Sequence, residues 1–130
     1  MINNVEVLDL KQIKTVERIF DLIVKEGLIN LSPNDIQHFF KDAKSLTVQS
    51  VNIKNATKED VEKSGILSDE LKKSQKCIIS IIGNANITLS DIDTIVGAIS
   101  SFHNCEYNFS TLYNETQKGY QIDTFLVRIK

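Results

Sequence analysis

Gly27-Leu28-Ile29-Asn30-Leu31-Ser32-Pro33-Asn34-Asp35-Ile36 is the stretch around which the chain is organised, because it closes one helical pattern and opens another. Gly27 fits the end of the first helix, since glycine adopts the left-handed conformation without strain. Ser32 fits the N-cap of the second helix, Pro33 its first turn, and Asp35 the N3 position near the positive helix end. These capping roles alone account for Ser32 and Asp35.

A long helix is predicted before this loop. From about Val5 to Lys25 the chain has no glycine or proline, and apolar residues recur at helical spacing: Ile13, Val16, Ile19, Phe20 and Ile23. We expect a helix of about twenty residues whose opening turns lack a strong cap. We place this core helix at residues 1–27, ahead of one compact unit at residues 28–130.

The remainder predicts an α/β (α+β) domain with a four-stranded mixed sheet packed by helices. Helices are expected at about 33–44, 57–65 and 88–102, and strands at 45–53, 77–82, 105–113 and 120–129. The alternation of the first strand slips between Val48 and Val51, which suggests a bulge. The stretch 66–76 is expected to be a loop with Ile66, Leu67 and Leu71 turned inward. The last two strands are expected to form a hairpin through residues 115–119.

The composition is that of one ordinary globular domain of 130 residues, with 42% apolar and 25% charged residues. A net charge of -2 gives no global basic field for nucleic acid or an anionic membrane. The lysines at 72, 73 and 76 are expected to form a solvated turn. Cys77 and Cys105 lie in apolar runs and are expected to be reduced core residues of a cytoplasmic protein. The sequence shows neither a signal peptide nor a membrane span.

The usual catalytic motifs are missing from the sequence. There is no glycine-rich phosphate loop, and His38 and His103 have no cysteine or histidine partners at metal-ligand spacing. Asp91 and Asp93 are interpreted as helix-start acids rather than a catalytic pair. On these residues alone, the function would stay undefined.

Two motifs resemble the C-terminal half of FtsZ, the bacterial relative of tubulin. The first is Ile19-Phe20-Asp21-Leu22-Ile23 followed by Gly27-Leu28-Ile29-Asn30, against a family pattern of roughly I-S-D-L-I-x-x-P-G-L-I-N-x-D-x-x-D. The second is Lys-Cys-Ile-Ile-Ser-Ile-Ile-Gly-Asn-Ala-Asn-Ile-Thr-Leu at 76–89, against a pattern like G-V-L-V-N-I-T-G-G-x-D-L-T-L. Both occur in the family's order and at nearly its separation. The resemblance implies the fold of the FtsZ C-terminal domain, preceded by its core helix.

The resemblance also implies a site between subunits. In FtsZ-like proteins the N-terminal domain binds GTP, and two acids in the loop after the core helix reach the nucleotide of the next subunit in a filament. Asp35 matches the second acid and Asn30 the family asparagine, so these are the candidate catalytic residues, with Gly27, Leu28 and Ser32 completing the loop. Ser32 stands where the first acid is expected, and a hydroxyl is no carboxylate at neutral pH.

The GTP-binding domain of that family has no counterpart in this sequence. We therefore expect no cofactor in the chain itself, with GTP reached only through a partner subunit. The favoured interpretation is a filament-interaction module of bacterial cell division that caps or modulates polymers of FtsZ or FtsZ-like subunits. Self-association through the long helix is a further expectation. The alternatives are one part of a split or truncated FtsZ-type GTPase, whose nucleotide domain is elsewhere, and a diverged domain that has lost its filament contacts.

Overall fold

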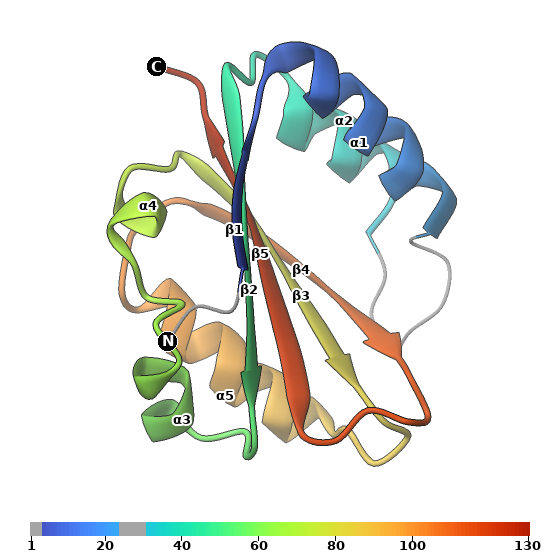
Figure 1. Cartoon of the computed structure of the whole chain (residues 1–130), viewed down its shortest axis with the longest axis vertical. Helices are drawn as coiled ribbons and strands as arrows, with labels where there is room; N and C mark the ends of the chain where they lie inside the picture. Colours follow the sequence, from blue (N-terminus) through green and yellow to red (C-terminus); the bar gives the residue numbers. More distant parts are fainter. Residues whose placement is uncertain (1–3, 24–30) are drawn as a thin grey trace.

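A computed structural model describes residues 4–23 and 31–130, with the side chains of residues 5–16 and 31–130 (Figure 1). The elements follow in the order β1 (Asn4–Leu8), α1 (Leu10–Ile23), α2 (Pro33–Phe40), β2 (Ser45–Ile53), α3 (Lys58–Lys63), α4 (Asp69–Lys72), β3 (Lys76–Gly83), α5 (Leu89–Ser100), β4 (Glu106–Tyr113) and β5 (Tyr120–Arg128). The strands form one five-stranded sheet of order β1-β2-β5-β3-β4.

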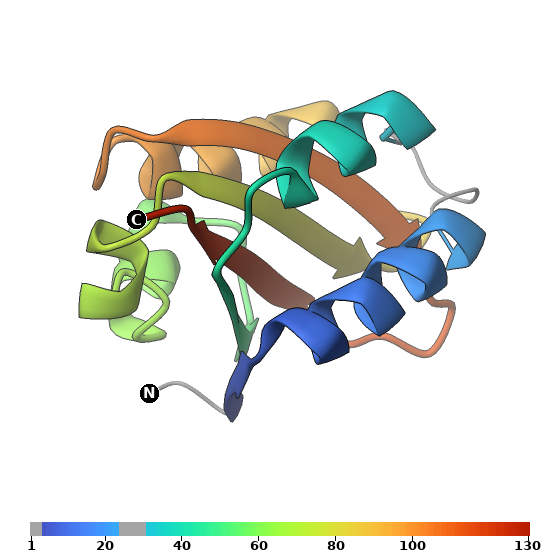
Figure 2. The same ribbon diagram turned by 90° about the horizontal axis from the view of Figure 1, so that it is seen from above.

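Helices cover both faces of this sheet. Figures 1 and 2 show α1 and α2 on one face and α3, α4 and α5 on the other. β3 is apolar on both sides for this reason: Cys77, Ile79 and Ile81 belong to the core under α5, whereas Ile78 belongs to the core under α1 and α2. Helices thus cover both faces of this central strand, which explains its uninterrupted run of apolar residues.

The first strand was not expected from the sequence. Residues 4–8 pair antiparallel with β2, from Asn4 opposite Ser50 to Leu8 opposite Leu46, so the sheet has five strands rather than four. The long helix is correspondingly shorter than predicted and contains 14 residues. It also has a cap, since Asp9 Oδ1 accepts from the Gln12 amide at 2.9 Å and Gln12 Oε1 accepts from the Asp9 amide at 3.0 Å. The expected core helix over 1–27 is therefore wrong at its beginning.

Two further expectations about the sheet are wrong. β2 pairs with β5 without interruption from Ser45 opposite Arg128 to Ile53 opposite Tyr120, so there is no bulge. The shift in alternation has another cause: both faces of β2 are covered, and apolar residues occur on each. The last two strands do not form a hairpin either, because β3 lies between them and pairs parallel with β4 and antiparallel with β5.

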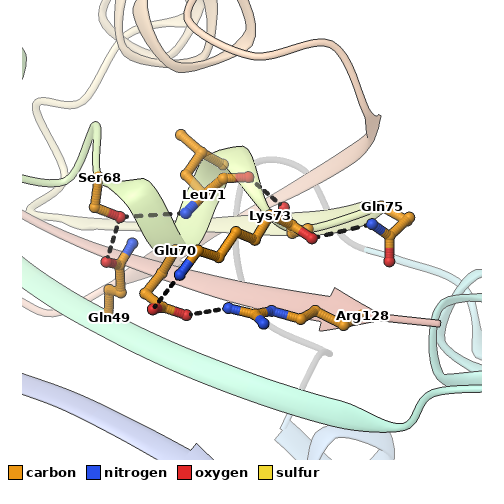
Figure 3. Close-up of polar contacts among 8 residues, drawn as sticks. Gln49, Ser68, Glu70, Leu71, Lys73, Gln75 and Arg128 are labelled. Atoms are coloured by element: carbon orange, nitrogen blue, oxygen red, sulfur yellow. Dashed lines mark hydrogen bonds and ion pairs between the residues drawn. The ribbon is translucent and has the colours of Figure 1, made fainter. Parts of the chain in front are cut away.

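A polar network holds α4 against the sheet. The side chain of Gln49 is completely buried in β2, and its Nε2 donates to Thr124 Oγ1 at 3.2 Å and to the Ile66 carbonyl oxygen at 3.4 Å. Its Oε1 accepts from Ser68 Oγ at 2.6 Å, and the same Ser68 oxygen caps α4 by accepting from the Leu71 amide (Figure 3). The stretch expected as a loop therefore contains a short helix. Ile66 before this helix and Leu71 within it are buried as predicted, and Leu67 is partly buried.

An ion pair adds a second link between α4 and β5. Arg128 Nη2 lies 2.8 Å from Glu70 Oε2, and Lys73 Nζ lies 3.9 Å from Glu70 Oε1 (Figure 3). Gln75 Oε1 accepts from the Ile129 amide at 2.8 Å, which fixes the end of β5 beside the start of β3. These contacts bind the segment between β2 and β3 to β5, a central strand of the sheet.

Alkaline pH is expected to weaken the fold through Tyr120. Its hydroxyl donates to Asp91 Oδ2 at 2.8 Å, and burial together with this carboxylate raises the pKa of Tyr120 to about 12. The folded chain favours the neutral phenol, so this contribution is complete below the ordinary tyrosine pKa of about 10 and is lost as the pH rises from there through about 12. We expect the difference between the urea midpoints of the chain and of Tyr120→Phe to disappear as the pH rises from about 10 to about 12. A gap that stays constant would contradict the assignment.

Candidate functional site

The beginning of α2 carries the two described residues of the predicted site, Ser32 and Asp35. Ser32 is the N-cap in extended conformation (φ -79°, ψ 158°), and its Oγ accepts from the Asp35 amide at 3.1 Å. Asp35 Oδ2 accepts in return from the Ser32 amide at 3.1 Å. This reciprocal capping box confirms the capping roles expected from the sequence.

Apolar residues on either side anchor this turn while the polar ones stay in solvent. Leu31 and Ile36 are 8% and 1% exposed and belong to the core under α1 and α2. Ser32 and Asp35 are both exposed. The helix start is thus fixed to the sheet, and its capping box leaves the Asp35 carboxylate exposed to solvent.

Asn30, Gly27 and Leu28 lie outside the described residues. The structure therefore brings together Ser32 and Asp35 only, and the assignment of Asn30 beside them stays a prediction.

One turn further along α2, sequence reasoning missed a contact with the edge of the sheet. His38 Nε2 lies 3.0 Å and 3.2 Å from the two carboxylate oxygens of Glu106, which begins β4. Both side chains are about half exposed, so the pair contributes little to stability. It does extend the polar surface of α2 from Asp35 to Glu106. No sequence pattern indicated the contact between His38 and Glu106, because the two residues are 68 positions apart.

The other end of α2 is capped by a buried lysine. Lys76 is only 9% exposed, and its Nζ donates to the carbonyl oxygen of His38 at 2.6 Å and to that of Lys41 at 3.5 Å. A cation suits the negative end of a helix dipole, and Lys76 gives the His38 carbonyl a second donor besides the Lys41 amide at 3.3 Å. The expectation of a solvated turn holds for the exposed Lys72 and Lys73 but is wrong for Lys76.

The described residues offer few other reactive groups. No group of three or more histidine, cysteine, aspartate or glutamate side chains among them could hold a metal ion. Burial raises the pKa of the Cys77 thiol and that of the Cys105 thiol, so neither is a thiolate nucleophile at neutral pH. What the site can do chemically is orient a partner or a water molecule through the exposed Asp35 carboxylate and the polar start of α2.

Within residues 4–23 and 31–130, no helix has the length and apolar character needed to cross a lipid bilayer.

Comparison with known proteins shows which solved structures have a similar fold. No protein-family profile matches the chain, and no curated protein matches it in sequence. Among solved structures, the W319Y mutant of FtsZ from M. jannaschii aligns with a TM-score of 0.69 at 19% identity, over 93% of this chain and 42% of the FtsZ chain. An empty FtsZ dimer from M. jannaschii aligns with a TM-score of 0.70 at 17% identity, over 95% and 41% of the two chains.

A second type of protein has a similar fold. TubZ from Bacillus thuringiensis serovar israelensis, in GDP-form protofilaments, aligns with a TM-score of 0.57 at 11% identity over 90% of this chain and 34% of its own. The chain thus spans about two fifths of the FtsZ structures that it matches. Its described part has the α/β fold of an FtsZ-like C-terminal domain, with five strands in the sheet.

Proposed function

We propose that the chain is a filament-interaction module that docks the loop between α1 and α2 on the GTP-binding face of an FtsZ-like subunit. The observation that carries the proposal is the exposed start of α2, where Asp35 is held outward by its capping box on a fold shared with FtsZ. The loop would place Asp35 at the nucleotide of that subunit. Cytoplasmic cell-division filaments are the setting that the resemblance implies.

Ser32 decides what such docking does. FtsZ-like sites use two acids in this loop, and here the first position carries a hydroxyl that is already engaged with the Asp35 amide. A single carboxylate positions the attacking water poorly. The module would therefore occupy the end of a polymer without promoting hydrolysis there, and would act as a cap.

The test is a titration of full-length FtsZ, such as that of M. jannaschii, with this chain. We expect less polymer in a pelleting assay and lower GTP turnover as the chain approaches the FtsZ concentration. Unchanged polymer and unchanged turnover at a large excess would refute docking at this face.

Substitution of Ser32 separates capping from catalysis. Ser32→Asp keeps an N-cap residue and adds the missing acid, so we expect it to reverse the effect and raise GTP turnover about tenfold over the unsubstituted chain. Ser32→Ala is the matched control, since it removes the cap at a cost of about 1 kcal/mol and adds no acid. Asp35→Asn should abolish the gain when combined with Ser32→Asp. Equal turnover with Ser32→Asp and Ser32→Ala would exclude a role for this position.

A second candidate is a subunit of a split or truncated FtsZ-type GTPase. It is favoured by the coverage, because the chain matches only 42% of an FtsZ chain. Under this proposal a nucleotide-binding domain in another chain would complete the enzyme, and mixing the two would produce GTP hydrolysis that neither shows alone.

A further inference from the structure

We infer that a groove at the end of the domain where α1 begins binds an acidic segment of a partner protein that carries a bulky apolar side chain. The groove has a volume of about 580 Å³. Leu10, Phe40, Ala43 and Ile129 form its apolar part, and Lys14 and Lys44 line it as cations. We call this site the basic groove.

Three segments that are far apart in the sequence form the basic groove. Figure 1 shows the first turn of α1, the end of α2 and the C-terminal residues at the same end of the molecule. Phe40 is 5% exposed and lies at the base of the groove, whereas Leu10 is 57% exposed. An exposed leucine beside a buried phenylalanine leaves apolar surface available for a large side chain of a ligand.

Charge selects the kind of partner. Among the described side chains, Lys14 and Lys44 line the basic groove together with Asp42. The exposed lysines at 11, 41 and 130 and the carboxylate of Asp9 directly neighbour lining residues in the sequence. The chain as a whole carries -2, so this end is basic on a molecule that is otherwise acidic. Carboxylates beside an apolar anchor of the partner would therefore meet Lys44 and the neighbouring lysines.

The wall of the basic groove is fixed before any ligand binds. Asp42 adopts a left-handed conformation with φ 60°, which aspartate tolerates better than most residues. The Ala43 amide donates to the Phe40 carbonyl at 3.2 Å, and the Lys44 amide donates to the Arg128 carbonyl at 2.8 Å. The turn is thus tied to α2 and to the end of β5, so little conformational freedom is lost on binding.

The chemistry favours an acidic peptide over a polyanion such as nucleic acid. A phosphate backbone gains nothing from the apolar floor, and the Asp42 carboxylate that lines the groove repels it. A peptide can place a leucine or phenylalanine on Phe40 and direct its carboxylates away from Asp42 toward Lys44.

This site is separate from the loop between α1 and α2. Ser32 and Asp35 lie at the beginning of α2 and the basic groove at its end, and the eight residues of that helix separate the two sites by about 12 Å. Binding at the basic groove is measured without FtsZ or GTP, so its failure and the failure of the proposed filament contact are distinguishable.

The experiment measures the fluorescence anisotropy of a labelled peptide, Glu-Asp-Glu-Leu-Phe-Asp-Glu-Asp, with the full chain. We expect saturable binding that weakens about tenfold in Lys11→Glu/Lys44→Glu and about fivefold in Leu10→Ser. The peptide with serine in place of leucine and phenylalanine should bind at least about tenfold more weakly. Amide resonances of residues 10, 40–44 and 129 should shift on titration, because these residues lie at the groove.

The matched control is Lys54→Glu/Lys118→Glu, which makes the same change of net charge at two exposed lysines elsewhere. It should leave the affinity unchanged within about twofold. Three results would overturn the proposal: equal loss in this control, equal binding of the peptide that lacks apolar residues, or stronger binding of heparin than of the peptide. Because Lys11, Lys44 and Leu10 are all exposed, the variants are expected to fold, and their circular dichroism spectra verify it.

Discussion

Gly119→Ala is expected to destabilise the chain by about 3 kcal/mol, or roughly 10 °C in Tm. Gly119 has φ 65°, in the left-handed region that costs an L-residue about 1–2 kcal/mol. A Cβ at this position would also overlap the carbonyl oxygen of Ile53 and lie 3.2 Å from Lys54 Cα. Both atoms belong to the backbone and cannot yield as a flexible side chain would. The last pair of β2 and β5, Ile53 opposite Tyr120, would have to separate.

Gly97→Ala is the matched control for this substitution. Gly97 lies inside α5, and a Cβ there would meet no atom within 4 Å. Alanine is the better helix former, so we expect a gain of about 0.5–1 kcal/mol. Urea denaturation of both variants tests the pair. A neutral Gly119→Ala would mean that the turn before β5 relaxes freely, contrary to the close approach described here.

Phe39→Ala is expected to cost about 3–5 kcal/mol. Phe39 is 1% exposed in the core under α1 and α2, and its ring meets that of Phe40 edge to face, with centroids 4.9 Å apart. Truncation would leave a cavity between α2 and the sheet and remove the aromatic contact. Because α2 also carries Ser32 and Asp35, the same variant should loosen the position of the candidate site.

Two further substitutions serve as comparisons for the stability of Phe39→Ala. Phe39→Leu keeps most of the volume and should cost distinctly less than Phe39→Ala. Gln37→Ala changes an exposed neighbour and should remain within about 0.5 kcal/mol of the unsubstituted chain. Unfolding free energies from chemical denaturation check all three. A cost below about 1 kcal/mol for Phe39→Ala would show that α2 is not packed as described.

Local signals in the sequence predicted most of the elements correctly. Ser32, Thr57 and Thr88 are N-caps as expected, because the capping hydrogen bond joins residues only three positions apart. The strand 45–53 has the expected bounds. Patterns of this kind depend on neighbouring residues and on one covered face, and both are visible in the sequence.

The errors concern partners that are distant in the sequence. Val5, Val7 and Leu8 fit a helical stripe, yet they form an edge strand in which Val5 and Val7 stay 48% and 64% exposed. The pairing with β2 determines this conformation, and the alternation of Val5, Glu6 and Val7 is too short by itself to distinguish a strand from the start of a helix. The hairpin was inferred because β4 and β5 are consecutive, but β3 inserts between them.

In the candidate site too, contacts between neighbouring residues were predicted and contacts between distant residues were missed. The capping role of Asp35 was readable from its position three residues after Ser32. The capping of the other end of α2 by Lys76 was not, because 38 residues separate Lys76 from His38. The five lysines of and beside the basic groove are likewise spread over three segments of the sequence, so the sequence alone did not indicate a basic surface.

The position of β5 has a consequence for synthesis of the protein. β5 ends at Arg128, and it joins β2 to β3 in the middle of the sheet. A nascent chain on the ribosome can therefore collapse around single helices, but it cannot connect the two halves of the sheet until its last strand emerges. Folding of this domain must therefore wait for β5, and until then the apolar residues of β2 and β3 are exposed to aggregation.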